Sequence, residues 1–497
     1  MASLVQTLET PSMEQFHQHD MMRLPHDLLG GSPAMVRAGE RYIERGDGES
    51  DKAYRERLRR PALLNTFKRT LAYMRGQVFQ KPVVFGDDAS ERFQLWAEDV
   101  DRAGNNVTAW AASVFEAGLC DGITYALADY SRVQVRQNNG VTEYFNETEQ
   151  TWQTKTVASD KANGWAPYLV HIPAQNVIDC WVETRGGWPV VTHFRYFEYG
   201  MEPDGRTKWG QQQVVRIRVL WADSWQVWVK HGDADIFELE SEGTSTLGVV
   251  PLSIFAPGEK CGHASAQPAL YDLADLNRRY WSASCGQCEL MEYVRRPVWF
   301  GRMLGKIRNA DGTESDVTVG AGRMLASEDP YGDLKSVGVD ASAVTASMAE
   351  LETIKNEMAM YGLQLLQPKS GALTATEVDR DASENNSTLM GWAVGFQDFL
   401  ENCLHYIAKW WGEEDGPSVK VNTQFSRAVQ DSYLLEMYRS GALSLETYHE
   451  LLKQTGTLPD DFDAEAEAEK LARGVMTNGT QGAAKSLASM LTGTGVV

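Results

Sequence analysis

Hydrophobic side chains recur at helical spacing in the first part of the chain. Phe67, Leu71, Met74 and Val78 stand at positions i, i+4, i+7 and i+11, so all four share one face of a helix. The same period recurs over about 91–119, where we expect a second helix.

The period of the pattern changes from 3.6 to two within residues 122–257. Alternate positions are apolar on both sides of a short turn, in the order Val215, Ile217, Val219, Trp221, Trp225, Val227 and Val229. This alternation predicts a β-hairpin with one buried face. We expect the whole of 122–257 to be rich in strands.

Helical periodicity returns in the second half of the chain and is interrupted twice. We expect helices over 266–295 and 341–362 around a short β-like segment, then a loop, then a long kinked helix from about 376 to 411. Helices of about 25 residues span about 35–40 Å at 1.5 Å per residue. The order helix, small insert, helix therefore predicts an antiparallel stalk with a head.

The two ends of the chain lack such periodicity. Residues 1–45 suggest an arm, and the Gly-, Thr- and Ser-rich residues 474–497 a mobile tail. The N-terminus has no basic segment followed by an apolar run, so we expect no signal peptide. No stretch reaches about 18 consecutive apolar residues, so we expect no membrane partner.

The charge is acidic overall but unevenly distributed. Lys and Arg number 47 against 68 Asp and Glu, a net charge of −21 with a pI near 4.9. A chain this acidic does not wrap nucleic acid with its whole surface, although DNA could still slide past it. Residues 52–81 are nevertheless basic, residues 413–470 are acidic, and residues 358–376 carry Lys369 as their single charged side chain.

No common catalytic or metal-binding signature is present. The six cysteines are scattered apart from Cys285 and Cys288, which fall inside a predicted helix and suit packed thiols. The segment 301–306 has one residue too few for a phosphate-binding loop. We therefore expect no catalytic residues, no metal and no cofactor, and a protein that is not an enzyme.

Several short segments together resemble the portal, or head-to-tail connector, proteins of tailed double-stranded DNA bacteriophages. They cover roughly residues 50–412 in this order: Arg60-Pro61 to Pro82, Gly118 to Gly122 with Asp129-Tyr130, Val250 to Leu252, Pro268 to Asn277 with Tyr280, Arg296-Pro297, Met360 to Gly362, Leu373 to Glu377, and Asn386-Ser387. Each segment alone is weak evidence for the family, and the resemblance depends on their occurring together in this order.

The resemblance implies an α+β, mainly helical, portal-type subunit. Its parts would be an N-terminal arm (1–45), a wing of helices and strands (46–265), a stem helix (266–295), a small α/β clip (296–340), a second stem helix (341–362), a tunnel loop (363–375), a long kinked wing helix (376–417), a helical crown (418–473) and a flexible tail (474–497). The stalk with a head follows from periodicity as well as from the resemblance.

The resemblance also implies a function and a set of partners. About twelve subunits would form a ring at one capsid vertex, the channel through which DNA is packaged and ejected. Partners would be the major capsid protein and scaffold, the large terminase subunit, and then neck or adaptor proteins. The protein would be assembled in the host cytoplasm and located in the virion.

Double-stranded DNA would pass through the channel without sequence-specific binding. Lys369, with Ser370 and Gly371 supplying mobility, is the candidate contact with the DNA backbone. An ordinary solvated loop lysine is an equal alternative. Arg302, Lys306 and Arg308 are candidate contacts of the clip with partners or DNA, although a role between subunits fits them as well. Another virion component, such as a capsid or tail subunit, and a cytosolic enzyme with an unrecognised site are the competing functions.

Overall fold

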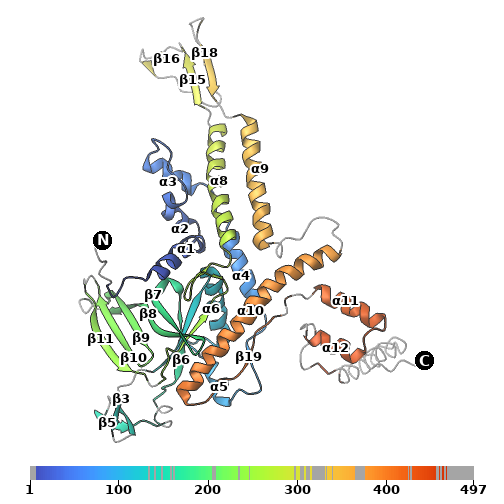
Figure 1. Cartoon of the computed structure of the whole chain (residues 1–497). Helices are drawn as coiled ribbons and strands as arrows, with labels where there is room; N and C mark the ends of the chain where they lie inside the picture. Colours follow the sequence, from blue (N-terminus) through green and yellow to red (C-terminus); the bar gives the residue numbers. More distant parts are fainter. Residues whose placement is uncertain are drawn as a thin grey trace. The chain divides into compact units, whose positions relative to one another are not determined.

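The structure, a computed structural model, begins with a block of helices, continues with a block of antiparallel strands and ends mainly in helices (Figure 1). It describes residues 7–131, 135–138, 141–146, 149–156, 159, 163–203, 207, 209–232, 236–245, 247–295, 298–302, 307–308, 314–315, 331, 333–337, 340–363, 375–423, 425, 428–454, 458, 462–463 and 466. The mixture of helix and sheet confirms the α+β expectation.

The chain divides into two units. The first comprises Met1–Arg75, Asp87–Gln367 and Phe399–Ser418, and the second Gly76–Gly86, Pro368–Asp398 and Val419–Val497. Each is described here by itself.

The first unit holds most of the secondary structure. Its N-terminal helices are α1 (Met13–Leu29), α2 (Gly31–Ala38), α3 (Asp51–Arg59), most of α4 (Thr66–Val78), α5 (Glu91–Trp96) and α6 (Val107–Asp121). Its main strands are β2 (Thr124–Tyr130), β6 (Pro167–Ile172), β7 (Val177–Arg185), β8 (Trp188–Pro203), β9 (Gln211–Trp221), β10 (Ser224–His231), β11 (Glu238–Thr244) and β12 (Leu252–Phe255).

These strands form two antiparallel sheets. One has the order β11-β10-β9-β8-β7, and the other the order β12-β2-β6. A shared apolar core contains side chains of both sheets, including Tyr125 of β2 and Phe194 of β8, whose rings are 5.4 Å apart. A smaller sheet is formed by β3 (Val135–Asn138), β4 (Val141–Asn146) and β5 (Thr151–Thr154).

The predicted hairpin is present, but it is buried on both faces. Strands β9 and β10 pair with Trp225 opposite Leu220 and Val227 opposite Arg218. Trp225 and Val227 of β10 therefore do not share a face with Ile217 of β9. Ile217 packs in a cluster that includes Leu8 from the N-terminal segment, whereas Leu220 belongs to the core between the sheets. The expectation of one buried face was wrong because the N-terminal segment covers the other.

Residues 13–38 differ from the expected arm. Ser12 caps α1 by accepting a hydrogen bond from the Gln15 amide, and the helix packs against α6, β7 and α8. Met22 and Leu28 are buried, as are the side chains of Gln15 and Gln18. The N-terminal segment from residue 13 is therefore part of the core of this unit.

The helix expected over 91–119 is divided. Helix α5 ends at Trp96 and α6 begins at Val107, with Asn106 as its N-cap. Between them the Asp101 side chain accepts hydrogen bonds from the amides of Ala103 and Asn105, which stabilises a turn.

The expected stalk is present as two paired helices (Figure 1). Helix α8 (Tyr271–Arg295) leads to the strands β15 (Val298–Arg302) and β18 (Asp333–Val337), which pair with each other, and α9 (Ala341–Met358) returns beside α8. A further pair is β16 (Ile307–Arg308) with β17 (Glu314–Ser315). No helix occurs among the described residues of 296–340, so the helical part of the expected α/β insert stays a prediction.

Helix α8 starts later than expected because residues 266–267 form the short strand β14. Its buried stripe of Leu273, Asn277, Trp281 and Cys285 repeats every four residues, which is the spacing of one helix face. Asn277 accepts a hydrogen bond from the Phe67 amide and donates one to the Leu64 carbonyl, both about the start of α4.

The second unit contains short strands and helices. Strand β1 (Val84–Phe85) pairs with β19 (Val419–Lys420), and Asn422 donates a hydrogen bond to the Gln77 carbonyl. Helix α10 (Ala375–Trp411) begins in this unit and is continuous, and its kink stays a prediction. Helices α11 (Ala428–Arg439) and α12 (Leu445–Gln454) occupy the region expected to be helical after residue 418.

Candidate functional site

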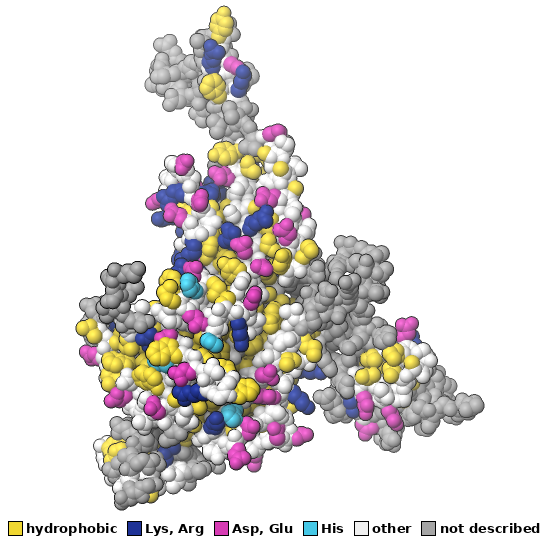
Figure 2. Space-filling view, in the orientation of Figure 1, with side chains coloured by type: hydrophobic (Ala, Val, Ile, Leu, Met, Phe, Trp, Pro, Cys, Tyr) yellow, Lys and Arg dark blue, Asp and Glu magenta, His cyan; other side chains and the backbone are white. Residues whose placement is uncertain are grey.

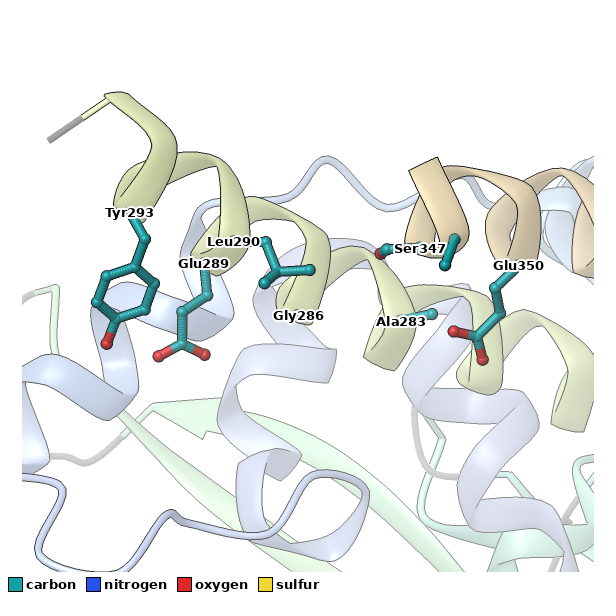
Figure 3. A pocket seen from close by; sticks show the side chains of 8 residues that line it. Ala283, Gly286, Glu289, Leu290, Tyr293, Ser347 and Glu350 are labelled. Carbon is teal, nitrogen blue, oxygen red and sulfur yellow. The ribbon is translucent and has the colours of Figure 1, made fainter. Parts of the chain in front are cut away.

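The paired helices α8 and α9 enclose a hollow of about 560 Å³ on their surface (Figure 3). It is lined by Ala283, Gly286, Glu289, Leu290 and Tyr293 from α8 and by Ala346, Ser347 and Glu350 from α9. We call this hollow the stem groove.

The floor of the stem groove is made of small side chains. Ala283, Gly286, Ala346 and Ser347 leave room that larger residues would fill. A methyl group added at Gly286 would meet no atom within 4 Å, which means that this helix position faces open space. Helix surfaces with small residues allow a second helix to approach closely.

The rim of the stem groove is partly apolar and partly acidic. Tyr293 is 48% exposed, and Leu290 adds a second apolar side chain from α8. Glu289 and Glu350 add carboxylates from the two helices (Figure 3). Apolar surface with charges at its edge is typical of a protein contact rather than of a small-molecule pocket.

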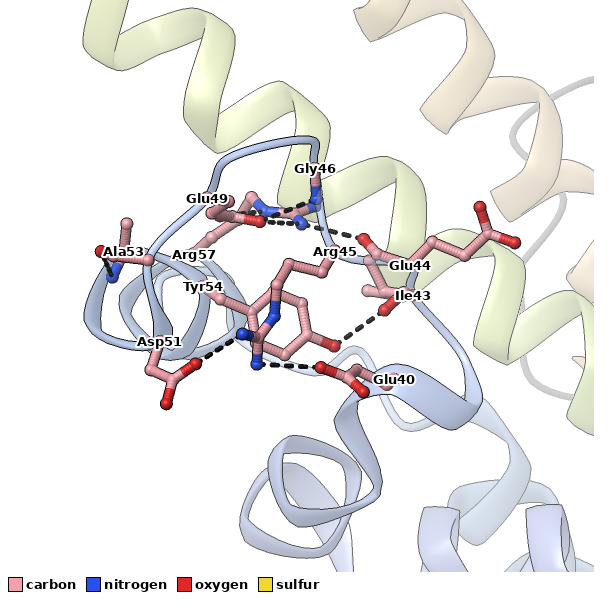
Figure 4. Close-up of polar contacts among 11 residues, drawn as sticks. Glu40, Ile43, Glu44, Arg45, Gly46, Glu49, Asp51, Ala53, Tyr54 and Arg57 are labelled. Carbon is pink, nitrogen blue, oxygen red and sulfur yellow. Dashed lines mark hydrogen bonds and ion pairs between the residues drawn. The ribbon is translucent and has the colours of Figure 1, made fainter.

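Helix α3 packs beside α8 and is held by a network of ion pairs (Figure 4). Arg57 contacts Glu49 at 2.7 Å, and Arg45 lies 2.9 Å from Glu40. The Tyr54 hydroxyl donates a hydrogen bond to the Ile43 carbonyl, so the turn before α3 is also fixed. The hydrogen bond from Arg57, above all, holds the pKa of the Glu49 carboxyl below its usual range.

A basic face remains on the outside of α3. Among the described residues no ion pair reaches the exposed side chains of Lys52, Arg55, Arg59 and Arg60. Dark blue and magenta side chains are interspersed in this region of the space-filling view (Figure 2). Within the basic segment 52–81, Arg57 forms an ion pair with Glu49 and Arg75 forms one with Glu116. Other cationic side chains of the segment are exposed to solvent.

The residues predicted to contact DNA lie outside the described part of the chain. This holds for Lys369, Ser370 and Gly371, and also for Lys306. Arg302 is described, is exposed, and stands opposite Asp333 in the ladder between β15 and β18. Arg308 stands opposite Glu314 between β16 and β17, and its side chain is outside the described residues.

Four of the six cysteines are buried, and Cys261 is exposed. All six are unpaired, and Cys285 is buried in the stripe of α8. Burial raises the pKa of Cys180, Cys285 and Cys403 to about 12, so these thiols stay protonated at neutral pH. A nucleophilic role needs a thiolate, and these three side chains do not provide one.

Sequence reasoning missed the polar contacts that dock α1. Gln15 donates a hydrogen bond to the Ala264 carbonyl at 2.7 Å, and Gln18 donates one to the Asp121 carbonyl at 2.7 Å. The Ala266 amide donates to the Gln18 side-chain oxygen. Ser12 followed three residues later by Gln15 fits a capping box, and that pattern could have indicated the helix.

No described helix is both long and apolar enough to cross a membrane.

Comparison with known proteins gives one family match and several structural likenesses. A family described as a domain of unknown function (DUF4055) matches residues 269–411, which run from just before α8 to the end of α10. None of the curated proteins matches the sequence.

Three solved structures have a similar chain. The neck of an empty GTA particle computed with C6 symmetry is 13% identical, with 76% of this chain and 87% of that chain covered and a TM-score of 0.41. The virion of a native gene transfer agent (GTA) particle is 14% identical, with 84% and 96% covered and a TM-score of 0.41. The neck of a native GTA particle computed with C12 symmetry is 13% identical, with 78% and 89% covered and a TM-score of 0.39.

Proposed function

We propose that the chain is a structural component of a phage-like particle, and within that particle the subunit of the portal ring. The observation that carries the proposal is the pair α8 and α9, which closes on a strand-built tip and bears an unfilled groove of small residues. The short segments that resemble portal proteins, in their order along the chain, include these same elements.

The parts of the subunit follow from this proposal. The sheets form the wing, α8 and α9 the stem, and the strand-built tip the clip that meets the terminase and then the neck proteins. Residues 363–375 form the tunnel loop, and α11 and α12 belong to the crown. Twelve copies would carry on the order of −250 charges, and acidic walls repel phosphate and let DNA slide.

The ring is tested by measuring the mass of the purified chain. Mass photometry should give about 660 kDa, the mass of twelve 55.4-kDa subunits in a closed ring. Negative-stain images should show an axial hole. A monomer under all conditions would contradict the proposal and favour an enzyme, and closed shells or trimers would favour a capsid or tail subunit.

The DNA contact is tested separately. In an end-on density map of the ring, the segment around Lys369 should project into the lumen, where about twelve lysines would contact the DNA backbone. A map that places this segment outside the lumen would contradict the role of Lys369 without contradicting the proposed ring.

Gly286→Ala should have opposite effects on the subunit and on the ring. Alanine in a helix interior is more stable than glycine by about 0.5–1 kcal/mol, and the added methyl group meets nothing inside the chain. If a neighbouring copy packs into the stem groove, the same methyl group occupies its space. We expect a higher unfolding temperature for dissociated subunits and fewer rings in mass photometry.

A matched control separates these two effects. Gly76 in α4 also has open space around an added methyl group, but it lies outside the stem groove. Gly76→Ala should stabilise the subunit without reducing the number of rings. If Gly286→Ala also left ring formation unchanged, the stem groove would not be a subunit contact.

A further inference from the structure

Three side chains of different chemistry converge where α1 meets α6. A ring nitrogen of His26, the sulfur of Cys120 and a carboxylate oxygen of Asp121 all lie within 4.8 Å of one another. Cys120 is 2% exposed and the Asp121 side chain 3%, while the His26 side chain is 34% exposed. The cluster is therefore enclosed except on the side of the imidazole.

The buried carboxylate has an unusual environment. Oδ1 of Asp121 is buried and has no hydrogen-bond partner among the described residues, although burying a carboxylate oxygen without such a partner is costly. His26 Nε2 lies 2.9 Å from Asp121 Oδ1, yet the contact lacks hydrogen-bond geometry and both atoms are buried.

Both helices end at this point. His26 lies in the last turn of α1, and Asp121 is the last residue of α6. The carbonyl ends of helices carry partial negative charge, which favours a cation nearby. The left-handed conformation of Gly122, with φ of +80°, ends α6 directly after the cluster.

We propose that His26, Cys120 and Asp121 bind a divalent transition-metal cation, with Zn²⁺ the best match. Thiolate, imidazole and carboxylate together are ligands that Zn²⁺ accepts. A tetrahedral ion with bonds of about 2.0–2.3 Å separates its ligand atoms by about 3.3–3.8 Å. His26 Nε2 and Asp121 Oδ1, 2.9 Å apart, would therefore move apart slightly, while all three ligand atoms already lie within 4.8 Å of one another. One thiolate and one carboxylate balance the two charges of the ion, and the exposed side of His26 leaves a fourth position for water.

The ion would fasten the N-terminal helix to the rest of the unit. Gln18 bridges the Asp121 carbonyl and the Ala266 amide, and Ala266 lies just before the stem helix α8. A metal at the cluster would strengthen this junction between α1, α6 and the base of the stem. Its binding does not depend on the proposed role of the protein in a particle.

The proposal is tested on the full-length chain, purified with a chelator and titrated with Co²⁺ alone. We expect one ion per chain, an absorption band from a cobalt–thiolate bond, and intense visible bands of tetrahedral Co²⁺. Zn²⁺ should displace the Co²⁺ and raise the unfolding temperature of the native chain by several degrees. Cys120→Ser should abolish the thiolate band and weaken binding by about tenfold or more.

Cys261→Ser is the matched control, because Cys261 is exposed and lies outside the cluster in a hollow with Glu14 and His17. It should retain the full cobalt spectrum. Loss of the thiolate band in Cys261→Ser but not in Cys120→Ser would overturn the proposal. Binding of well under one Co²⁺ per native chain would also overturn it, and the cluster would then be a buried pair of His26 and Asp121. The native spectrum decides this even if Cys120→Ser fails to fold.

Discussion

Gly122→Ala should unfold the first unit or reduce its free energy of unfolding by about 4 kcal/mol or more, because three backbone segments cross at this glycine. A Cβ atom at position 122 would lie 2.4 Å from the Gln267 carbonyl oxygen and 2.6 Å from that of Ala266. Real Cβ contacts are longer than 3.0 Å, and the obstructing atoms are backbone. Gly258 approaches from the other side and donates a hydrogen bond to the Gly122 carbonyl.

The left-handed backbone alone does not explain so large a loss. Gly248 has a φ of +69°, and a Cβ atom there would meet nothing within 4 Å. Gly248→Ala should therefore cost only the conformational penalty of about 1–2 kcal/mol. Urea unfolding followed by far-ultraviolet circular dichroism gives both values. Equal losses in the two variants would mean that the crossing at Gly122 is not tight.

The stem helices could be predicted because their burial is apolar and periodic. In α8 the stripe that contains Leu273, Trp281 and Cys285 repeats every four residues, and the sequence shows it without further knowledge. The β9–β10 hairpin was found in the same way from its alternation. Both patterns arise because one stretch of chain buries its own hydrophobic side chains.

Helix α1 could not be found by this signal. Two of its buried positions are Gln15 and Gln18, whose amides bond to backbone groups about 250 and 100 residues away. Such burial is stabilised by hydrogen bonds rather than by apolar area, so hydrophobic periodicity does not register it. The division between α5 and α6 was missed for a related reason, since the Asp101 side chain stabilises a turn inside an otherwise helical pattern.

The candidate site was only partly accessible from sequence. The stem groove depends on how α8 and α9 align, because Gly286 and Ser347 become neighbours only after the two helices pair. Small residues are common in helices and carry no signal by themselves. The metal cluster likewise joins His26 to Cys120 and Asp121 through the docking of α1, which the sequence pattern did not predict.

Asp129→Asn should be the second strongly destabilising change, with an expected loss of about 3–5 kcal/mol. Asp129 on β2 accepts a hydrogen bond from Arg218 on β9 at 2.8 Å, and this pair connects the two sheets. Arg218 is only 4% exposed, and its guanidinium also donates to the Tyr196 hydroxyl. Burial acts to lower the pKa of Arg218, but Tyr196 and Asp129 outweigh it and the pKa is raised. A guanidinium is not deprotonated in proteins even without its carboxylate partner, so the cation persists after the substitution.

The loss of stability in Asp129→Asn has two sources, the lost hydrogen bond to Arg218 and the buried guanidinium that remains without a carboxylate. A second substitution, at Arg218, separates the two. In Asp129→Asn with Arg218→Met no buried cation remains, so part of the lost stability should return. Glu183→Gln is the exposed control, because Glu183 and Arg185 pair on the surface of β7 with side chains more than half exposed. That change should cost at most about 1 kcal/mol. A double variant less stable than Asp129→Asn alone would show that Arg218 contributes through its other contacts, and not through an unbalanced charge.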